Sequence, residues 1–204
     1  MEQESRLPEE WPVLVRPMAL DDVEEVYRIE RATFSMPWSA RSFTYDLTRN
    51  PSAFYLVAQA RPGLVWRGAP SLPDLQEAPI LGYGGLWMLV DEGHISTLAV
   101  RPGWRGRGLG ELLLWHLLQK AVELGAQEAT LEVRVSNQAA IALYQKYRFH
   151  VVGRRPRYYT DNQEDAFIMT TEPLQTPAYR ALLAERRAAL LRRLWTQVVR
   201  QAQA

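Results

Sequence analysis

The sequence lacks cysteine altogether and has only three histidines among its 204 residues. Disulfides, thiolate nucleophiles and cysteine metal ligands are therefore excluded, and three scattered histidines argue against a metal centre. No apolar run approaches the roughly 20 residues that a helix needs to cross a bilayer. The first 12 residues are mainly acidic and polar, without the apolar core of a secretory signal. We therefore expect a cytoplasmic protein that binds neither a metal nor a membrane.

Composition and length indicate one folded domain with an extension. Hydrophobic residues make up 47% and charged residues 23% of the chain, as in ordinary globular proteins. We expect a flexible tail over 1–12, a domain over 13–174 and an amphipathic, arginine-rich helix over 175–204. The net charge of +1 argues against nucleic-acid binding across the whole surface. Only the last helix is strongly basic, because residues 178–200 hold six arginines and one glutamate.

Hydrophobic spacing and capping residues predict a mixed α/β order. Helices are expected over 21–33 with Asp21 as cap, from Ser39 for a few turns, and over 109–124, 139–147 and 178–200. Strands are expected over 13–16, 54–60, 80–90, 94–100, 129–135, 150–153 and 165–171. Residues 61–79 contain four prolines and show no period, so we interpret them as a long inserted loop. This order fits a mixed sheet flanked by helices.

A glycine-rich turn precedes the clearest helix of the chain. Its sequence, Trp-Arg-Gly-Arg-Gly-Leu-Gly over 104–110, follows a predicted strand. Glycines let backbone N–H groups turn toward a ligand, the helix start carries about half a positive charge, and Arg105 and Arg107 add two full charges. These features predict a pyrophosphate site. The glycine spacing fits neither a dinucleotide fingerprint nor a P-loop, and a tight turn with solvated arginines is the alternative.

The same turn resembles a family signature. Arg-Gly-Arg-Gly-Leu-Gly is similar to the Arg/Gln-x-x-Gly-x-Gly/Ala motif with which the GNAT superfamily of acetyltransferases holds the pyrophosphate of coenzyme A. Other segments resemble the RimI branch of that superfamily, which acetylates the N-terminal alanine of a ribosomal protein. They lie at 37–39, 131–137, 140–144, 157–159 and 164–166, and the segment at 94–100 is similar to the superfamily strand that binds the acetyl-pantetheine arm. Because these motifs occur in the family order over about 13–174, the resemblance is specific.

The resemblance implies a GNAT-type fold, in which helices flank a mixed, mostly antiparallel central sheet, and acetyl-coenzyme A as cosubstrate. It places the acetyl-pantetheine arm on the backbone of Leu98, Ala99 and Val100, whose N–H groups would stabilise the carbonyl oxygen. It assigns the role of base to Glu132 and that of acid to Tyr144. The further coenzyme residues that it implies are Arg105, Gly106, Arg107, Gly108, Leu109, Gly110, Glu111 and Asn137.

Each catalytic candidate also has a plain structural interpretation. Glu132 lies on the strand face that Thr130 and Arg134 share, where it can take an amine proton or simply pair with Arg134 or another surface charge. Tyr144 is either a proton donor or a helix aromatic packed in the core. A phenol of pKa about 10 donates to a thiolate of pKa about 8.5 only if the site assists. Arg148 stands where most relatives have glycine, so its turn is either strained or different.

We expect a protein N-terminus as the acceptor, with a ribosomal protein as the candidate partner. An α-amine has a pKa of about 7.7–8.0 and a lysine amine one of about 10.4, so deprotonating lysine costs about 3.4 kcal/mol more. A lysine or small-amine acetyltransferase is the first alternative, and a non-catalytic module that binds coenzyme A or RNA is the second. RNA contact would use only the basic last helix, for which packing on the domain is the simpler interpretation.

Overall fold

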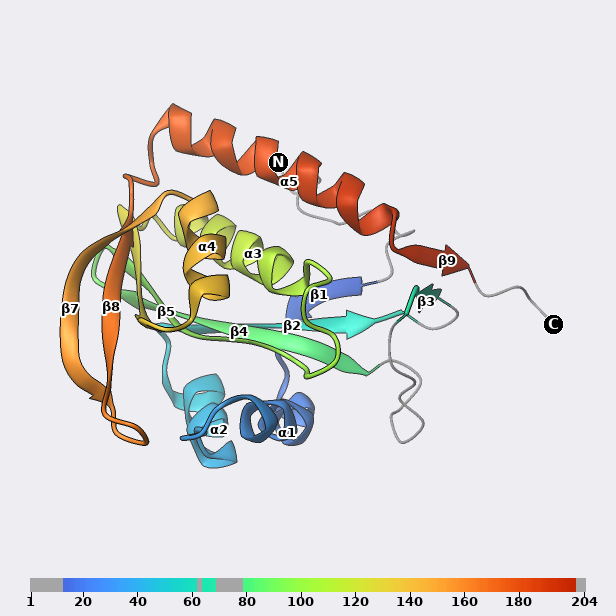
Figure 1. Ribbon diagram of the computed structural model, residues 1–204, viewed down its shortest axis with the longest axis horizontal. Helices are drawn as coiled ribbons and strands as arrows, with labels where there is room; N and C mark the ends of the chain where they lie inside the picture. Colours follow the sequence, from blue (N-terminus) through green and yellow to red (C-terminus); the bar gives the residue numbers. More distant parts are fainter. Residues whose placement is uncertain (1–12, 62–63, 69–78, 201–204) are drawn as a thin grey trace.

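A twisted central sheet organises the protein. The computed structural model describes residues 13–61, 64–68 and 79–200, and the tail expected over 1–12 lies outside them. The strands of the sheet are β1 (Val13–Pro17), β2 (Ala53–Ala60), β4 (Ile80–Leu89), β5 (Glu92–Val100), β6 (Glu128–Arg134), β7 (Phe149–Tyr159) and β8 (Glu164–Thr171). They lie in the order β1-β2-β4-β5-β6-β8-β7 (Figure 1). All neighbours are antiparallel except β5 and β6, which confirms the expected mixed, mostly antiparallel sheet.

Helices cover both faces of the sheet. They are α1 (Val23–Thr33), α2 (Ala40–Arg49), α3 (Leu109–Glu123), α4 (Gln138–Lys146) and α5 (Pro177–Trp195). Figure 1 shows α1 and α2 below the sheet, α3 and α4 above it, and α5 outside α3. In the described part of the chain, no helix is long and apolar enough to span a bilayer.

Helix α3 is buried on most sides because it lies between the sheet and α5. Leu113 belongs to the apolar stripe that the sequence predicts and is fully buried, and so is its neighbour Leu114. The indole Nε1 of Trp115 donates to the carbonyl of Leu183 in α5 at 2.8 Å. A helix that is apolar nearly all round needs a second cover on its outer face. The C-terminal extension provides this cover.

The two expected caps near the N-terminus have different outcomes. The side chain of Ser39 accepts a hydrogen bond from the first turn of α2 at 3.2 Å, which confirms this cap. The expectation that Asp21 caps the first helix is wrong. The chain enters α1 through a 3-10 turn, where the Asp22 carboxylate accepts from the Ala19 N–H at 2.7 Å and pairs with Arg16 at 2.6 Å. Asp22 therefore stabilises this entry in place of Asp21.

The 61–79 insertion and the C-terminal extension meet in a second, two-stranded sheet. Strand β3 (Leu64–Trp66) pairs antiparallel with β9 (Val198–Arg200). The helix expected over 178–200 ends at Trp195. The chain then forms a strand, because its backbone N–H and C=O groups can pair with those of β3. The expectation that the insertion is a long loop is therefore wrong for residues 64–66, which form β3. Neither strand has a hydrophobic period long enough to be recognised in the sequence.

The turn between α4 and β7 contains a strained residue. Arg148 has a φ of 57°, in the left-handed region that glycine adopts without steric cost. Its guanidinium pairs with Glu172 at 2.7 Å on the surface. The turn thus keeps the backbone conformation suited to glycine. The sequence left open a strained turn or a different turn, and the strained turn is correct.

Glycine at this position is expected to relieve the strain. Arg148→Ala keeps the left-handed backbone and loses the ion pair with Glu172, whereas Arg148→Gly loses both the ion pair and the strain. We expect the glycine variant to exceed the alanine variant in free energy of unfolding by about 1 kcal/mol in chemical denaturation. Equal stabilities of the two variants would contradict a strained turn.

Candidate active site

The central cleft arises where two parallel strands separate. Strand β5 pairs with β4 along its length but with β6 only from Glu92 to His94. An irregularity in the β4–β5 pairing at Gly85 accompanies the bend of β5 away from β6. Beyond this point a cleft of about 1110 Å³ opens, lined by residues 95–100 of β5 and 131–134 of β6. The edge of β5 that faces the cleft therefore offers backbone groups to a ligand.

The start of α3 lies at one end of the cleft. Gly108 is its N-cap with a φ of 88°, and Gly106 has a φ of 74°. No side chain caps the helix, so the N–H groups of its first turn are left for a ligand. Arg105 lines the cleft, and its Nε donates to the Val100 carbonyl at 3.2 Å. The residues present fit an anionic group such as a pyrophosphate.

The side chain of Arg107 is directed elsewhere. Its guanidinium donates to the carbonyls of Arg67 and Gly68, at 3.0 and 2.5 Å, and lies 5.9 Å from the ring of Trp104. The structure thus corrects the expectation that this arginine adds its charge to the ligand site. The cause is the insertion, whose backbone carbonyls bind the guanidinium. All other predicted coenzyme residues line the cleft: Leu98, Ala99, Val100, Arg105, Gly106, Gly108, Leu109, Gly110, Glu111 and Asn137.

Glu111, in the first turn of α3, is a buried acid with two cationic partners. Its carboxylate pairs with Arg193 of α5 at 2.7 Å and with Lys146 of α4 at 3.3 Å. Burial raises the pKa of Glu111, but the hydrogen bonds and charges of Arg193 and Lys146 outweigh burial and hold the pKa below its ordinary value. The two cations also line the cleft, and neither was identified in the sequence.

Glu132 faces the cleft from β6. Its carboxylate contacts Nη2 of Arg155 at 3.0 Å and Nε2 of His94 at 3.4 Å. Arg134, the partner considered from the sequence, instead pairs with two acids of the β7–β8 hairpin. Arg155 and His94 approach from β7 and β5, so only the assembled sheet brings them to Glu132.

A polar chain behind His94 determines which ring nitrogen carries its proton. Nδ1 lies 3.0 Å from the hydroxyl of Thr130, which donates to the carboxylate of Glu92. Since the hydroxyl has only one proton, it accepts from the Nδ1–H of His94. In a neutral His94, Nε2 is then an acceptor, 3.4 Å from a second acceptor on Glu132. Such a pair can share a proton, or both members can accept hydrogen bonds from one water or amine that lies beside them.

Tyr144 of α4 is buried and also borders the cleft. Its ring centroid lies 5.6 Å from that of Phe149. Burial, with a smaller contribution from Tyr159, raises the pKa of the Tyr144 phenol well above its usual value. Tyr144 is therefore packed in the core, as the structural interpretation holds, and it also lines the cleft.

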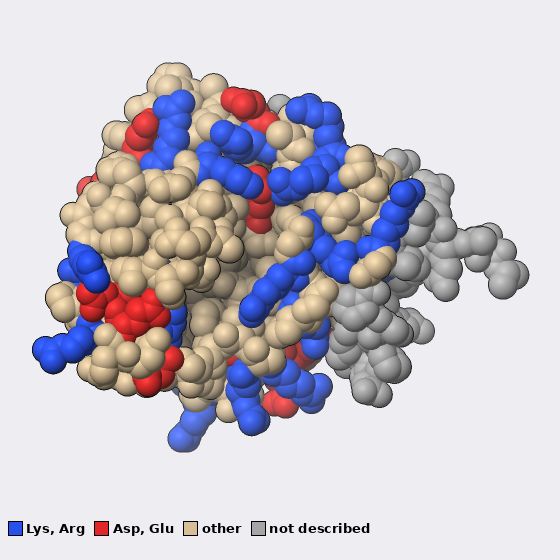
Figure 2. Space-filling model, in the orientation of Figure 1, with Lys and Arg blue, Asp and Glu red and all other residues tan. Residues whose placement is uncertain are grey.

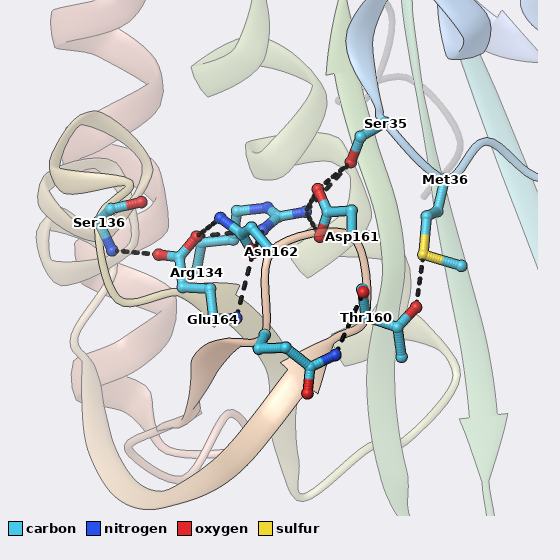
Figure 3. Close-up of polar contacts among 9 residues, drawn as sticks. Ser35, Met36, Arg134, Ser136, Thr160, Asp161, Asn162 and Glu164 are labelled. Carbon is cyan, nitrogen blue, oxygen red and sulfur yellow. Dashed lines mark hydrogen bonds and ion pairs between the residues drawn. The ribbon is translucent and has the colours of Figure 1, made fainter.

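Arg134 joins two loops at the end of the cleft away from α3 (Figure 3). Its guanidinium donates to both carboxylate oxygens of Asp161, at 2.9 and 2.8 Å, and to Glu164 at 3.0 Å, both in the β7–β8 hairpin. Ser35, between α1 and α2, donates to the same Asp161 at 2.5 Å. The guanidinium also lies 3.9 Å over the ring of Tyr159. These contacts tie the α1–α2 segment to the hairpin across the mouth of the cleft.

Comparison with known proteins agrees with this geometry. Residues 23–149 match the acetyltransferase (GNAT) family. The chain belongs to this family. GNAT enzymes use acetyl-coenzyme A as the acetyl donor, so this protein is an acetyl-coenzyme A-dependent acetyltransferase, and its open helix start suits the pyrophosphate of that cosubstrate.

Relatives in this family show how far the similarity extends. A Bacillus subtilis protein provisionally named ribosomal protein bS18-alanine N-acetyltransferase is 39% identical over 155 residues, which cover 76% of this chain and 92% of the relative. The Escherichia coli ribosomal protein bS18-alanine N-acetyltransferase is 33% identical over 150 residues, 72% of this chain and 89% of the relative. The crystal structure of the E. coli enzyme aligns with a TM-score of 0.65 and 27% identity, and covers 80% of this chain and 95% of that one.

Glu30 of α1 is a buried acid at the cleft that the sequence analysis missed. One of its oxygens accepts from the Trp38 N–H at 2.9 Å and the other from the hydroxyl of Tyr83. Burial raises the pKa of Glu30 to about 7, although the bond from Trp38 opposes the rise. A signal was available in the sequence, because Glu30 continues the apolar stripe of Val23 and Val26 at helical spacing.

The stability contributed by Glu30 is expected to depend on pH. Its pKa in the folded protein, about 7, is above its ordinary 4.5, so the contribution is complete below pH 4.5 and is lost as the pH rises through 7. Relative to Glu30→Gln, the wild type should lose on the order of 3 kcal/mol of unfolding free energy across this range. Urea denaturation at several pH values measures this difference, with the exposed Glu24→Gln on the same helix as control. Parallel pH profiles of wild type and Glu30→Gln would contradict the prediction.

Proposed function

We propose that this acetyltransferase moves the acetyl group of acetyl-coenzyme A to the α-amine of a protein N-terminus, with the N-terminal alanine of a ribosomal protein as its natural acceptor. The observation that carries the proposal is the Arg134 bridge across the mouth of the cleft. A mouth bridged in this way admits the end of a chain more readily than a segment from its middle. The names of the B. subtilis and E. coli relatives support the same acceptor. Such an acceptor implies a cytoplasmic place of action.

Residues 13–174 form the catalytic domain in this proposal, and residues 175–204 are its extension. The pantetheine arm of the cosubstrate lies along the free edge of β5, with the backbone of Leu98, Ala99 and Val100 beside the thioester. N–H groups there stabilise the oxygen that becomes negative when the carbonyl is attacked. The first turn of α3 and the Arg105 side chain bind the pyrophosphate.

Glu132 acts as the base. The acceptor ammonium donates to both the Glu132 carboxylate and Nε2 of His94, the two acceptors 3.4 Å apart, from the cleft side of the pair. Glu132 takes one proton from it, directly or through one water, and the neutral amine attacks the thioester carbon. A C–N bond forms, the C–S bond breaks, and the second amine proton leaves with the collapse of the tetrahedral intermediate. His94, fixed in its tautomer by Thr130, holds the amine in place for this step.

Tyr144 assists the departing sulfur. Its raised pKa keeps the phenol protonated at neutral pH, so the proton is available throughout the reaction. A thiolate of pKa about 8.5 is a weaker base than this phenolate, so the phenol alone does not drive the transfer. The hydrogen bond from the phenol to the sulfur lowers the barrier, and a proton released by the amine completes the formation of the thiol.

Peptides with different N-termini test the acceptor class. The protein is incubated with acetyl-coenzyme A and each peptide, and the release of free thiol is followed. We expect turnover with a free N-terminal alanine and none with a blocked N-terminus and a free lysine. Turnover with the blocked peptide would instead indicate a lysine acetyltransferase, and coenzyme binding without any turnover would indicate a non-catalytic module.

Two conservative variants test the catalytic assignments. Glu132→Gln and Tyr144→Phe are expected to lower kcat by about 100- to 10,000-fold, because the first removes the base and the second removes the hydrogen-bond donor to the departing sulfur. The Kd for acetyl-coenzyme A, measured by calorimetry, should change by less than about threefold. Glu128→Gln, at an exposed position of β6, and Tyr45→Phe, at an exposed position of α2, are matched controls. Equal losses of turnover and coenzyme affinity would assign Glu132 and Tyr144 to structural roles.

Opening the mouth of the cleft should affect the peptide more than the coenzyme. Asp161→Ala removes the acceptor that Arg134 and Ser35 share, so the link between the α1–α2 segment and the hairpin is reduced to the Arg134–Ser35 and Thr160–Met36 contacts. We expect the KM for an N-terminal peptide to rise by about 10-fold, as for the loss of a charged hydrogen bond, with an unchanged Kd for acetyl-coenzyme A. A normal peptide KM would show that this bridge does not shape the acceptor site.

A further inference from the structure

The end of α5 packs directly on the coenzyme-binding turn. Leu190 and Leu194 of α5 are buried against Gly108. A Cβ atom on this glycine would lie 3.1 Å from the Leu194 side chain, 3.3 Å from that of Leu190 and 3.0 Å from Nη2 of Arg193. The extension therefore touches the N-cap of α3, where the cosubstrate phosphates bind in the proposed function.

Arg193 is the residue of α5 that reaches the cleft. Among the described residues of that helix it alone lines the cleft, and its side chain is 43% exposed. Nη2 donates to Glu111 at 2.7 Å, and no protein acceptor is seen in the described residues for the N–H groups of its other two nitrogens. A guanidinium that is half fixed by an ion pair and half open has donors ready for a second anion.

The local balance of charge favours such an anion. Glu111 supplies one negative charge, whereas Arg193 and Lys146 supply two positive charges around it. Figure 2 shows Lys and Arg side chains along the rim of the hollow on this face, with acidic atoms between two of them. Glu111 thus positions the two cations and balances only one of their two charges, and the remaining positive charge lies beside the open start of α3.

The second sheet holds Arg193 in place. Two residues after α5 ends, β9 pairs with β3, and Trp66 of β3 is buried against Trp104 of the glycine turn, with ring centroids 6.3 Å apart. The extension is therefore fixed on both sides of Arg193, by Leu190 before it and by Leu194 and β9 after it. A preorganised cation binds a phosphate at a smaller entropic cost than a free side chain.

We infer that Arg193 is a cosubstrate-binding residue, which donates from its open N–H groups to a phosphate of acetyl-coenzyme A. The inference rests on the proposed function, because it requires the pyrophosphate at the start of α3. Acetyl-coenzyme A carries two phosphate groups that a guanidinium can bind in the same way, the pyrophosphate and the 3′-phosphate. The extension thereby becomes part of the active site and not only a cover for α3.

Calorimetry with the full chain tests this role. Arg193→Gln is expected to raise the Kd for acetyl-coenzyme A by about 10- to 100-fold, the usual effect of losing hydrogen bonds to a charged group. Arg192→Gln is the matched control, because it makes the same change of charge at an exposed neighbour that does not line the cleft. Arg193→Lys, which keeps the charge but not the fork of donors, should recover part of the affinity.

A second variant separates phosphate binding from mere support of the helix. Glu111→Gln weakens the same ion pair but leaves the Arg193 guanidinium free. If Arg193 only anchors α5, both variants should lower the thermal midpoint and the coenzyme affinity equally. If Arg193 binds phosphate, Glu111→Gln, which keeps the guanidinium and loses only its positioning, should lose only part of the affinity that Arg193→Gln loses. Equal losses in both variants would overturn the inference.

The choice of ligand identifies the phosphate. A loss of affinity in Arg193→Gln for coenzyme A but not for 3′-dephospho-coenzyme A assigns the contact to the 3′-phosphate, and a loss for both assigns it to the pyrophosphate. Affinities of Arg193→Gln equal to those of Arg192→Gln for both ligands would refute the contact. Failure of the wild type itself to bind any coenzyme would instead refute the proposed function.

Discussion

The separation of β5 from β6 beyond His94 determines where the other parts of the site can lie. Because β4 holds β5 along its other edge, β5 can leave β6 without unfolding. The same divergence brings the end of β5 to the glycine turn and the end of β6 to the start of α4. The helix start for the phosphates, the carboxylate of Glu132 and the phenol of Tyr144 therefore surround one opening. A pair of strands that stayed bonded would leave no space between these groups.

Two segments, the 61–79 insertion and the C-terminal extension, support the glycine turn through different residues. The insertion binds Arg107 through backbone carbonyls and places Trp66 against Trp104. The extension packs leucines on Gly108 and brings Arg193 to the cleft. Positive φ values give such a turn few internal restraints, so contacts from outside decide how rigid it is. The insertion and the extension therefore both contact the glycine turn, which depends on neighbouring segments for its rigidity.

Local patterns in the sequence predict the elements of the fold well, because helix caps and hydrophobic periods act over a few residues. The family motifs also identify the residues around the cleft. The partners of Glu132 were not predictable, since His94 and Arg155 meet it only through the register of three strands. The path of Arg107 and the pairing of β3 with β9 were missed for the same reason. Contacts between segments far apart in the chain leave no local period.

The pairing of β3 with β9 has a consequence for how the enzyme is made. Residues 198–200 leave the ribosome after the other helices and strands of the described residues, yet they complete the brace on the glycine turn. A nascent chain can form its sheet and α3 early, but the brace waits for residues 198–200. Cosubstrate uptake would thus report that synthesis has reached this segment, and a partly made chain would hold its acetyl donor poorly.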